Sequence, residues 1–515
     1  MLFKKRSGLS NSDLSKNKSL SSDKKELLEA LYDDISDALV EEGIAADVEV
    51  MVSMKTKKIG VIINNNKKIT IHYKSKKDIL NNDKKWEKNV KDIIEKETNK
   101  SSFQTKYIVS LKENCNLSEL SLANADITIN DIISESINGF ICYASAEEIT
   151  LFSQTNSHLI EGVSEDDLVG IPDDEFPNDI DIQSQKNIKE KKLSKVNSRT
   201  IINSYIKRIG GDTCSRKIGT KNPIFSISKV SNDNSPNPIR VFVFDTGIDK
   251  HPDLTINDKL SKNFTTDDPT DWYDRNGHGT HVAGTIGAND NDEVSGIAPD
   301  IEVISYKTVG DRGEGSLSNL YKAFDDVLLH KKNNPNEICI INMSLTSKKG
   351  TTFTTYSDIV NKLIKEGIII IVAAGNDNID ANNMLPASIP EVITVGAYDD
   401  TNNNLASFSN FGVSVDILAP GVQIKNTWLK GGYAKLNGTS MATPIVTGAV
   451  VNLIAMSARN NIILNQENVK NIIKYSAIDS NKNSRNPFII LKQNALLAKT
   501  TNISLYIGEY INTDF

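Results

Sequence analysis

The sequence lacks an apolar run long enough to span a bilayer, so we expect no transmembrane helix and no membrane partner. The basic residues at positions 1–6 are followed by a polar, serine-rich stretch instead of the apolar core of a secretory signal. We therefore expect neither a membrane anchor nor classical secretion. The protein would reside in the cytoplasm, or be exported or packaged by a non-classical route.

Cysteine is scarce, and its few positions are widely separated. The chain has four cysteines, Cys115, Cys142, Cys214 and Cys339, none of them in CxxC spacing. This pattern is typical of free thiols in a reducing compartment, and it excludes a disulfide framework and a cysteine-based zinc site.

An excess of basic charge is also missing. The chain has 59 Lys and Arg residues against 66 Asp and Glu residues, which gives a net charge of −7. Nucleic-acid-binding domains normally carry a basic patch or stripe. We therefore expect no nucleic-acid partner.

At 515 residues the chain is too long for one hydrophobic core, so several domains are expected. Residues 1–22 are polar and aperiodic, which predicts disorder. Residues 23–100 combine helical and strand-like patterns and should form an accessory α/β unit of unknown role. Its expected elements are a helix over 26–42, strands over 48–53, 59–63 and 69–73, and a helix over 86–97.

Residues 104–164 have a pattern of their own, which predicts a small α+β domain. Ser145 and Glu148 have the spacing of a capping box, which predicts a helix over 145–152. The expected strands are 107–111, 139–143 and 159–163. Residues 165–200 are charged, contain Pro172 and Pro177 and lack apolar periodicity, so we expect a flexible linker that is easily cleaved.

Residues 201–497 should form the largest domain, and from Ile239 onward short apolar runs alternate with helical stretches. This alternation predicts an α/β fold with a parallel sheet and helices on both faces. The remaining residues, 498–515, would form a C-terminal tail. The expected strands are 241–244, 303–307, 339–343, 368–373 and 392–395.

Three side chains of this domain have the chemistry of nucleophilic catalysis. Asp245 ends an apolar strand, at the edge of the sheet where ligands bind in α/β proteins. His278 begins a segment of small residues, 278–284, that would allow a helix to pack closely on the sheet. Ser440 opens a long apolar helix, whose start offers free backbone N–H groups to a negatively charged oxygen.

Each of these residues also has a simpler explanation. Asp245 could open a turn, and Ser440 could be a helix N-cap. His278 and His281 lie three residues apart, which would suit a metal pair, although the HExxH pattern is absent. We interpret His281 as a buried, hydrogen-bonded structural histidine.

The three motifs together resemble those of the subtilisin family, the subtilases. The order Asp, His, Ser is the subtilisin order, and the histidine motif matches over seven residues. The resemblance covers residues 104–497 and implies a serine endopeptidase that needs no cofactor for its chemistry. By resemblance, Ser440 is the nucleophile, His278 the general base and Asp245 the residue that orients the imidazole.

Other roles follow from the resemblance alone. Asn376 matches the oxyanion-hole residue of the family, although an asparagine after a strand is usually only a turn residue. Two segments correspond to the edges that bind an extended peptide substrate between them. They contain Gly313, Glu314 and Gly315 in the first, and Ser344 and Leu345 in the second.

Met384 corresponds to the floor of the primary specificity pocket, which implies a shortened pocket that disfavours large aromatic side chains. Alternatively, Met384 only fills the core. Asp253 and Asn291 resemble calcium ligands of the family, and their oxygen atoms suit Ca²⁺. A solvated acidic loop without a metal is the alternative.

Residues 104–164 resemble the inhibitory propeptide that precedes many subtilase catalytic domains. The expected fold is a subtilisin-like domain preceded by this small α+β domain and by the extra N-terminal α/β unit. The expected partners are polypeptide substrates and the protein's own propeptide in cis, with autocatalytic cleavage of a zymogen. The rival hypothesis is a catalytically silent protein that uses the protease scaffold for binding.

Overall fold

The structure is a computed structural model of the full chain. It describes residues 2–5, 48–53, 58–63, 67–72, 105–121, 127–172, 180–181, 237–289, 293–349, 353–402, 404–459, 462–476, 478–479 and 489–490.

The N-terminal unit contains an antiparallel sheet of four strands in sequence order. They are β1 (Leu2–Lys5), β2 (Val48–Ser53), β3 (Lys58–Ile63) and β4 (Lys67–His72). The last three coincide closely with the expected strands. β1 lies within the segment 1–22, for which we expected disorder, and pairs with β2. The helices expected over 26–42 and 86–97 lie outside the described residues.

A second antiparallel sheet has the order β6-β7-β5-β8. Its elements are β5 (Thr105–Leu111), β6 (Thr128–Ile133), β7 (Gly139–Ala144), helix α4 (Ala146–Thr155) and β8 (Ile160–Glu165), with a short 3₁₀ turn η2 (Leu117–Glu119). The predicted capping box is confirmed, because the Ser145 amide donates to Glu148 Oε2 (2.7 Å) and the Glu148 amide donates to Ser145 Oγ (3.2 Å). Phe140 and Phe152 pack edge to face between sheet and helix.

The largest sheet has the order β12-β14-β11-β16-β18-β20-β22-β26-β25. In addition, β13 pairs with β14 and β21 pairs with β20. Strands β14, β11, β16, β18, β20 and β22 run parallel. The bounds are β11 (Ile239–Asp245), β12 (Thr255–Ile256), β13 (Lys262–Asn263), β14 (Glu302–Lys307), β16 (Ile338–Met343), β18 (Ile369–Ala373), β20 (Ile393–Asp399), β21 (Asn404–Leu405), β22 (Ile417–Pro420), β25 (Ile478–Asp479) and β26 (Ile489–Ile490). All five strands expected from the apolar runs are present.

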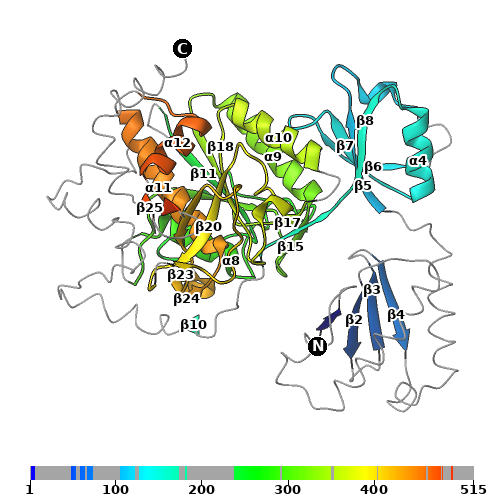
Figure 1. Cartoon of the computed structure of the whole chain (residues 1–515). Helices are drawn as coiled ribbons and strands as arrows, with labels where there is room; N and C mark the ends of the chain where they lie inside the picture. The colour runs from blue at the N-terminus through cyan, green and yellow to red at the C-terminus, as the bar shows by residue number, and fades with distance from the viewer. Residues whose placement is uncertain are drawn as a thin grey trace. The chain divides into compact units, whose positions relative to one another are not determined.

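The two faces of this sheet carry separate cores, because alternate residues of a strand point to opposite faces. Val241 and Val243 join the apolar cluster formed with α8, α11 and α12. Phe242 and Phe244 join the cluster formed with α9 and α10. The predicted α/β architecture with helices on both faces is therefore confirmed (Figure 1). The helices are α8 (His278–Gly287), α9 (Leu317–Asn333), α10 (Phe353–Lys365), α11 (Thr439–Arg459) and α12 (Gln466–Ser476).

Short strands complete the domain. β9 (Leu168–Gly170) pairs with β15 (Glu314–Ser316), and β17 (Ser347–Lys348) pairs with β19 (Met384–Leu385). A small three-stranded sheet contains β10 (Ile180–Asp181), β24 (Gly432–Leu436) and β23 (Ile424–Trp428). Two 3₁₀ turns are η5 (Ala381–Asn383) and η6 (Leu429–Gly431). β9 and β10 lie within residues 165–200, where we expected only a flexible linker.

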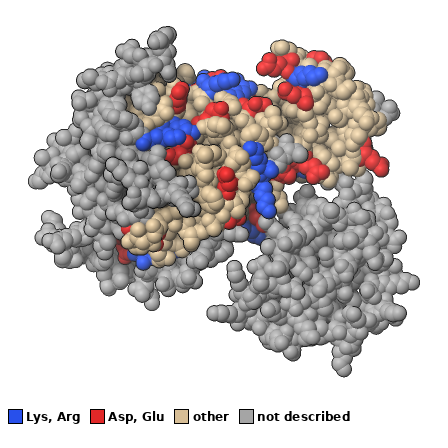
Figure 2. All heavy atoms as spheres, in the orientation of Figure 1, with Lys and Arg blue, Asp and Glu red and all other residues tan. Residues whose placement is uncertain are grey.

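The described surface is mixed in charge. Basic and acidic side chains lie interspersed on the face shown in Figure 2. Among the described residues, no helix combines the length and the apolar character needed to cross a membrane.

Candidate active site

Asp245 and His278 are joined by a short hydrogen bond. Asp245 is the last residue of β11, and its buried Oδ1 lies 2.7 Å from His278 Nδ1. Because a carboxylate is only an acceptor, Nδ1 carries the hydrogen and Nε2 of the neutral ring is left as the basic nitrogen. The Thr246 amide donates to the same Oδ1 (2.7 Å), which fixes the carboxylate orientation.

Glycines allow helix α8 to come this close to the end of β11. A Cβ on Gly279 would lie 2.1 Å from the carbonyl oxygen of Gly247, and a Cβ on Gly277 would lie 2.4 Å from the Trp428 ring. Gly277 also has φ +109°, a conformation that favours glycine. The small residues around His278 are therefore required by packing.

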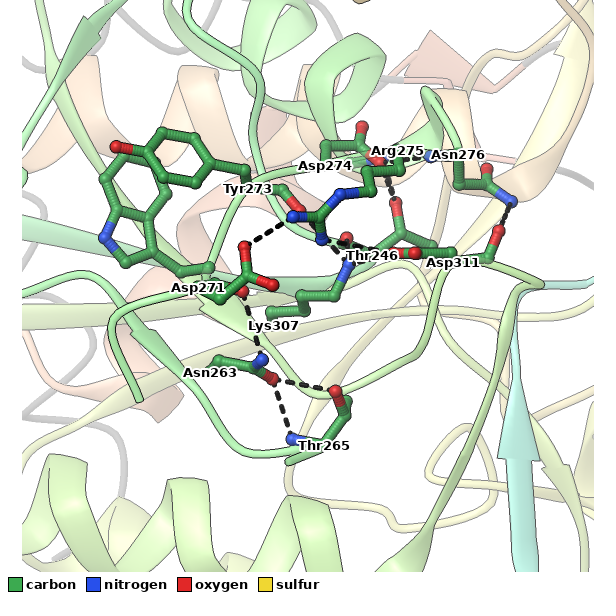
Figure 3. Close-up of polar contacts among 12 residues, drawn as sticks. Thr246, Asn263, Thr265, Asp271, Tyr273, Asp274, Arg275, Asn276, Lys307 and Asp311 are labelled. Atoms are coloured by element: carbon green, nitrogen blue, oxygen red, sulfur yellow. Dashed lines mark hydrogen bonds and ion pairs between the residues drawn. The ribbon is translucent and has the colours of Figure 1, made fainter. Parts of the chain in front are cut away.

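Asp274 holds this arrangement together and was missed in the sequence analysis. Its Oδ1 accepts from Thr246 Oγ1 (2.9 Å) and the Gly277 amide (2.9 Å), and its Oδ2 accepts from the amide (3.0 Å) and hydroxyl (2.6 Å) of Thr280. Burial raises the pKa of Asp274, while the hydrogen bonds from Gly277, Thr280 and the Asn276 amide act to lower it. Figure 3 shows Asp274 between Thr246 and the segment that leads to His278. The only sequence signal was its position four residues before that histidine.

Ser440 lies in the first turn of α11 and is buried. Its Oγ contacts the carbonyl oxygen of Ser344 at 3.5 Å, and Ser344 Oγ donates to the Ser440 carbonyl (2.9 Å). The parallel register pairs Phe244 with Met343, so Asp245 and Ser344 follow adjacent strand ends. The sheet therefore brings Asp245, His278 and Ser440 to the same edge.

Asn376 follows β18, the next strand along the sheet, and is tied to the Ser440 segment. Its Oδ1 accepts from the Thr439 amide (2.9 Å) and from Thr439 Oγ1 (2.8 Å). These two bonds orient the side-chain amide, so that its Nδ2 group is directed away from Thr439. Asn376 is thus held beside the residue that precedes the serine.

The two predicted substrate-binding segments are occupied by a strand of the same chain. In β15, Glu314 pairs with Gly170 and Gly315 pairs with Val169. The Ile171 amide donates to the Gly313 carbonyl (3.0 Å), and Gly170 exchanges two hydrogen bonds with Thr346 (3.0 and 2.9 Å). We call Gly313–Ser316 together with Ser344–Thr346 the peptide-binding edge, after the role that the sequence analysis predicted for these segments.

Side chains beside this edge bury part of the strand that it holds. Val169 is buried in the apolar cluster that also contains Leu345. Met384 pairs with Lys348 and is buried in a small cluster with Ala374, two residues before Asn376. Met384 therefore belongs to the same small cluster as a residue close in sequence to the oxyanion-hole candidate.

The predicted calcium ligands are only partly described. Asp253 is buried, its Oδ2 accepts from the Tyr433 hydroxyl (2.6 Å), and its carbonyl accepts from the Asn289 amide (2.7 Å). Asn289 Oδ1 is buried and has no hydrogen-bond partner among the described residues. Asn291 lies outside the described residues. Within those residues, no three His, Cys, Asp or Glu side chains form a metal-binding group.

His281 has the contacts of a structural histidine, which confirms that interpretation. Its Nε2 donates to the carbonyls of Ile424 (2.9 Å) and Ala434 (3.2 Å), which ties α8 to β23 and β24. Burial lowers the pKa of His281 to about 3, so the ring is neutral at physiological pH.

Comparison with known proteins gives the family. A sequence model described as the Subtilase family matches residues 237–496. The chain belongs to the subtilase family. Subtilisin Savinase from Lederbergia lenta is 38% identical over 240 residues, which are 46% of this chain and 83% of Savinase. The match with an alkaline protease from Alkalihalobacillus alcalophilus is also 38% identical and covers 59% of that protein.

Among solved structures, a cold-adapted subtilisin-like serine proteinase is similar. It is 29% identical, with a TM-score of 0.41, over 55% of this chain and 97% of that protein. As a subtilase, the chain is classed as a serine-type endopeptidase.

We predict that His281 makes stability depend on pH. An unfolded histidine has a pKa of about 6.5, whereas His281 has one of about 3 in the folded state. Between these values the unfolded chain binds a proton that the folded chain excludes. The free energy of unfolding should therefore fall as the pH is lowered from about 6.5 to 3, by up to about 1.4 kcal/mol per pH unit from this residue.

Denaturant unfolding between pH 7 and pH 5 measures this contribution in a Ser440→Ala background, which avoids self-digestion. His281→Gln keeps an N–H donor but does not titrate, so the pH dependence should become weaker. The exposed His158→Gln serves as the matched control and should leave it unchanged. An identical pH dependence with and without His281 would refute the prediction.

Proposed function

We propose that Ser440, His278 and Asp245 cleave peptide bonds as nucleophile, general base and orienting carboxylate. The 2.7 Å bond from His278 Nδ1 to Asp245, at the edge where Ser440 contacts Ser344, carries this proposal. Nε2 takes the proton of the Ser440 hydroxyl as Oγ attacks the carbonyl, and returns it to the leaving amine. Asp245 stabilises the imidazolium that forms between these two steps.

Two donors would bind the negative oxygen of the tetrahedral intermediate. One is Asn376 Nδ2, on the amide that Thr439 orients. The other is the Ser440 amide, at the start of α11, where backbone N–H groups lack partners within the helix. Donors fixed before the reaction stabilise the developing charge without reorganising.

Residues 104–164 would act as the protein's own inhibitory propeptide. Asp166, just beyond β8, accepts from the amide (2.7 Å) and hydroxyl (2.6 Å) of Ser318 at the start of α9. Asp325 on the same helix accepts from the amides of Ser134 (3.1 Å) and Glu135 (2.8 Å). β9 then fills the peptide-binding edge as an extended substrate would, which supports inhibition in cis.

The register also favours one site of self-cleavage. Gly170 and Thr346 form a hydrogen-bonded antiparallel pair, so the next such pair is Pro172 with Ser344. Ser344 is the residue that Ser440 contacts. We therefore narrow the expected cut, within the segment 163–203, to the bond after Pro172. Because proline has no N–H, the last bond of this ladder cannot form, and cleavage there should be slow.

Ser440 is required for both reactions that the proposed mechanism predicts. The wild-type chain should react with a fluorophosphonate probe and be cut after Pro172, because both reactions need the Ser440 oxygen. Ser440→Ala should remain full length and unlabelled. Intact-mass measurement and N-terminal mass spectrometry after purification read out both results.

A catalytically silent binding protein would give a different outcome. In that case wild type and Ser440→Ala would be equally intact and equally unlabelled. Labelling of both chains to the same extent would instead point to a nucleophile other than Ser440.

Met384 allows a test of the predicted substrate pocket. If Met384 forms its floor, Met384→Gly should raise kcat/KM for Phe before the scissile bond relative to Ala by about tenfold or more, because pocket volume decides this discrimination. Met384→Leu, which keeps most of the volume, should leave the ratio near the wild-type value. An unchanged ratio in both variants would make Met384 a core residue only.

A structural calcium ion fits the residues near Asp253. Asn289 Oδ1, which is buried and has no hydrogen-bond partner in the described part of the chain, and the Asp253 carboxylate are hard oxygen donors of the kind that Ca²⁺ prefers. The ion would tie Asn289 to the buried segment around Asp253. It would supply stability only, since the proposed chemistry uses protein groups alone.

A further inference from the structure

Lys307 is a buried cation beside the catalytic carboxylate, and the reaction scheme above does not use it. It ends β14, where the parallel register pairs it with Asp245. Its side chain is only 3% exposed. The three N–H groups of its ammonium have three acceptors: the carbonyls of Thr246 (2.8 Å) and Tyr273 (3.2 Å) and Asp311 Oδ1 (2.6 Å). Figure 3 shows Lys307 among these segments.

The three acceptors belong to different parts of the site. Thr246 directly follows the catalytic Asp245, and Tyr273 directly precedes Asp274, which frames the start of α8. Asp311 lies in the turn that leads into β15. One ammonium group therefore connects the carboxylate turn, the histidine segment and the loop that carries the peptide-binding edge.

Asn276 makes a second link between the same parts. Its Oδ1 accepts from the His278 amide (3.2 Å), and its Nδ2 donates to the Asp311 carbonyl (3.0 Å). The turn continues to Gly313, whose amide donates to Gly310 (2.9 Å) and whose carbonyl accepts from Ile171 of the bound strand (3.0 Å). A path of hydrogen bonds and short backbone segments thus runs from the strand bound at this edge, through Gly313 and Asp311, to the segments that carry Asp245 and His278.

We propose that Lys307 is a positioning residue that couples occupation of the peptide-binding edge to the alignment of Asp245 and His278. The proposal rests on the protease function proposed above. Enzymes can use binding energy from remote parts of a substrate to raise kcat, which requires a physical link between the remote contacts and the reacting groups. Here the ion pair between Lys307 and Asp311 forms that link. The buried ammonium of Lys307 thus contacts both the segment that carries Asp245 and the loop that leads to the peptide-binding edge.

A purely structural role gives a different expectation. If the ammonium only held the fold, its loss would affect every substrate equally. If it transmits contact with the edge, its loss would affect substrates that reach the edge more than those that do not. Substrate length therefore separates the two roles.

The test compares two substrates on the full chain after it has processed itself. One is a tetrapeptide amide that can pair with the peptide-binding edge, and the other is a single-residue ester that cannot. Lys307→Met keeps the aliphatic stem and removes the charge. The ratio of kcat/KM for tetrapeptide over ester should fall by about tenfold or more, mainly through kcat of the tetrapeptide.

Asp311→Asn provides a milder variant, since Asp311 is 48% exposed and its backbone carbonyl still serves Asn276. In Asp311→Asn the ratio of kcat/KM for tetrapeptide over ester should fall by about threefold. In the variant that combines Lys307→Met with Asp311→Asn, this ratio should fall by less than the product of the two single effects, because both residues belong to one ion pair. Asp258→Asn is the matched control, because the exposed Asp258 carboxylate forms an ion pair with Lys250 instead of Lys307. This variant should keep the wild-type ratio of kcat/KM for tetrapeptide over ester.

Equal losses for both substrates in Lys307→Met, with a wild-type ratio in Asp311→Asn, would overturn the coupling and leave Lys307 a structural residue. If Lys307→Met does not fold, the Asp311→Asn ratio alone decides. A wild-type chain that hydrolyses neither substrate and does not react with the fluorophosphonate would instead refute the proposed function, and the coupling with it.

Discussion

The packing around the active site depends on the hydrogen bond between Asp245 and His278. A helix must bring its first residue within 2.7 Å of a carboxylate at the end of a buried strand. The helix can approach this closely only because Gly279 has no side chain, since a Cβ there would lie 2.1 Å from the Gly247 carbonyl oxygen. Gly247 and Gly277 allow similarly close contacts with the backbone of residues 272–274 and with the Trp428 ring. The Thr246 amide and the imidazole both donate to Oδ1 of the buried carboxylate, whereas Oδ2 has no hydrogen-bond partner among the described residues. The small residues around His278 are therefore needed for close packing, and His278 itself is needed for the proposed chemistry.

The parallel sheet brings the other groups to this bond. β11, β16 and β18 are neighbours, so the residues that follow them emerge at one edge although they are far apart in sequence. Asp245 ends β11, while Ser344 and Asn376 follow β16 and β18, and the start of α11 lies against the last two. β15 pairs with β9 in a separate two-stranded sheet, and Gly170 of β9 also pairs with Thr346, two residues beyond Ser344. In the proposed mechanism, catalysis and substrate binding therefore depend on one register.

The sequence predicted those features that are local or that occur in continuous motifs. Long apolar runs identified five strands of the large sheet, β11, β14, β16, β18 and β20, and Ser145 with Glu148 identified a helix start. β9 escaped prediction because a three-residue strand has no periodicity, and its partner, β15, is about 150 residues away. Asp274, Asn276 and Lys307 were missed for a similar reason. Their importance lies in contacts between distant segments, and a buried Lys or Asp looks like any surface charge until its partners are known.

The state of the His278 ring tests the central interaction most directly. With histidine-selective ¹⁵N labelling of the Ser440→Ala chain, which has six histidines, NMR at about pH 8 distinguishes the protonated from the unprotonated ring nitrogen. Comparison with an Asp245→Asn chain assigns the His278 signals. The hydrogen should reside on Nδ1, held by Asp245, and Nε2 should be unprotonated. A His278 ring protonated at Nε2 with a bare Nδ1, unaffected by Asp245→Asn, would contradict the proposed mechanism.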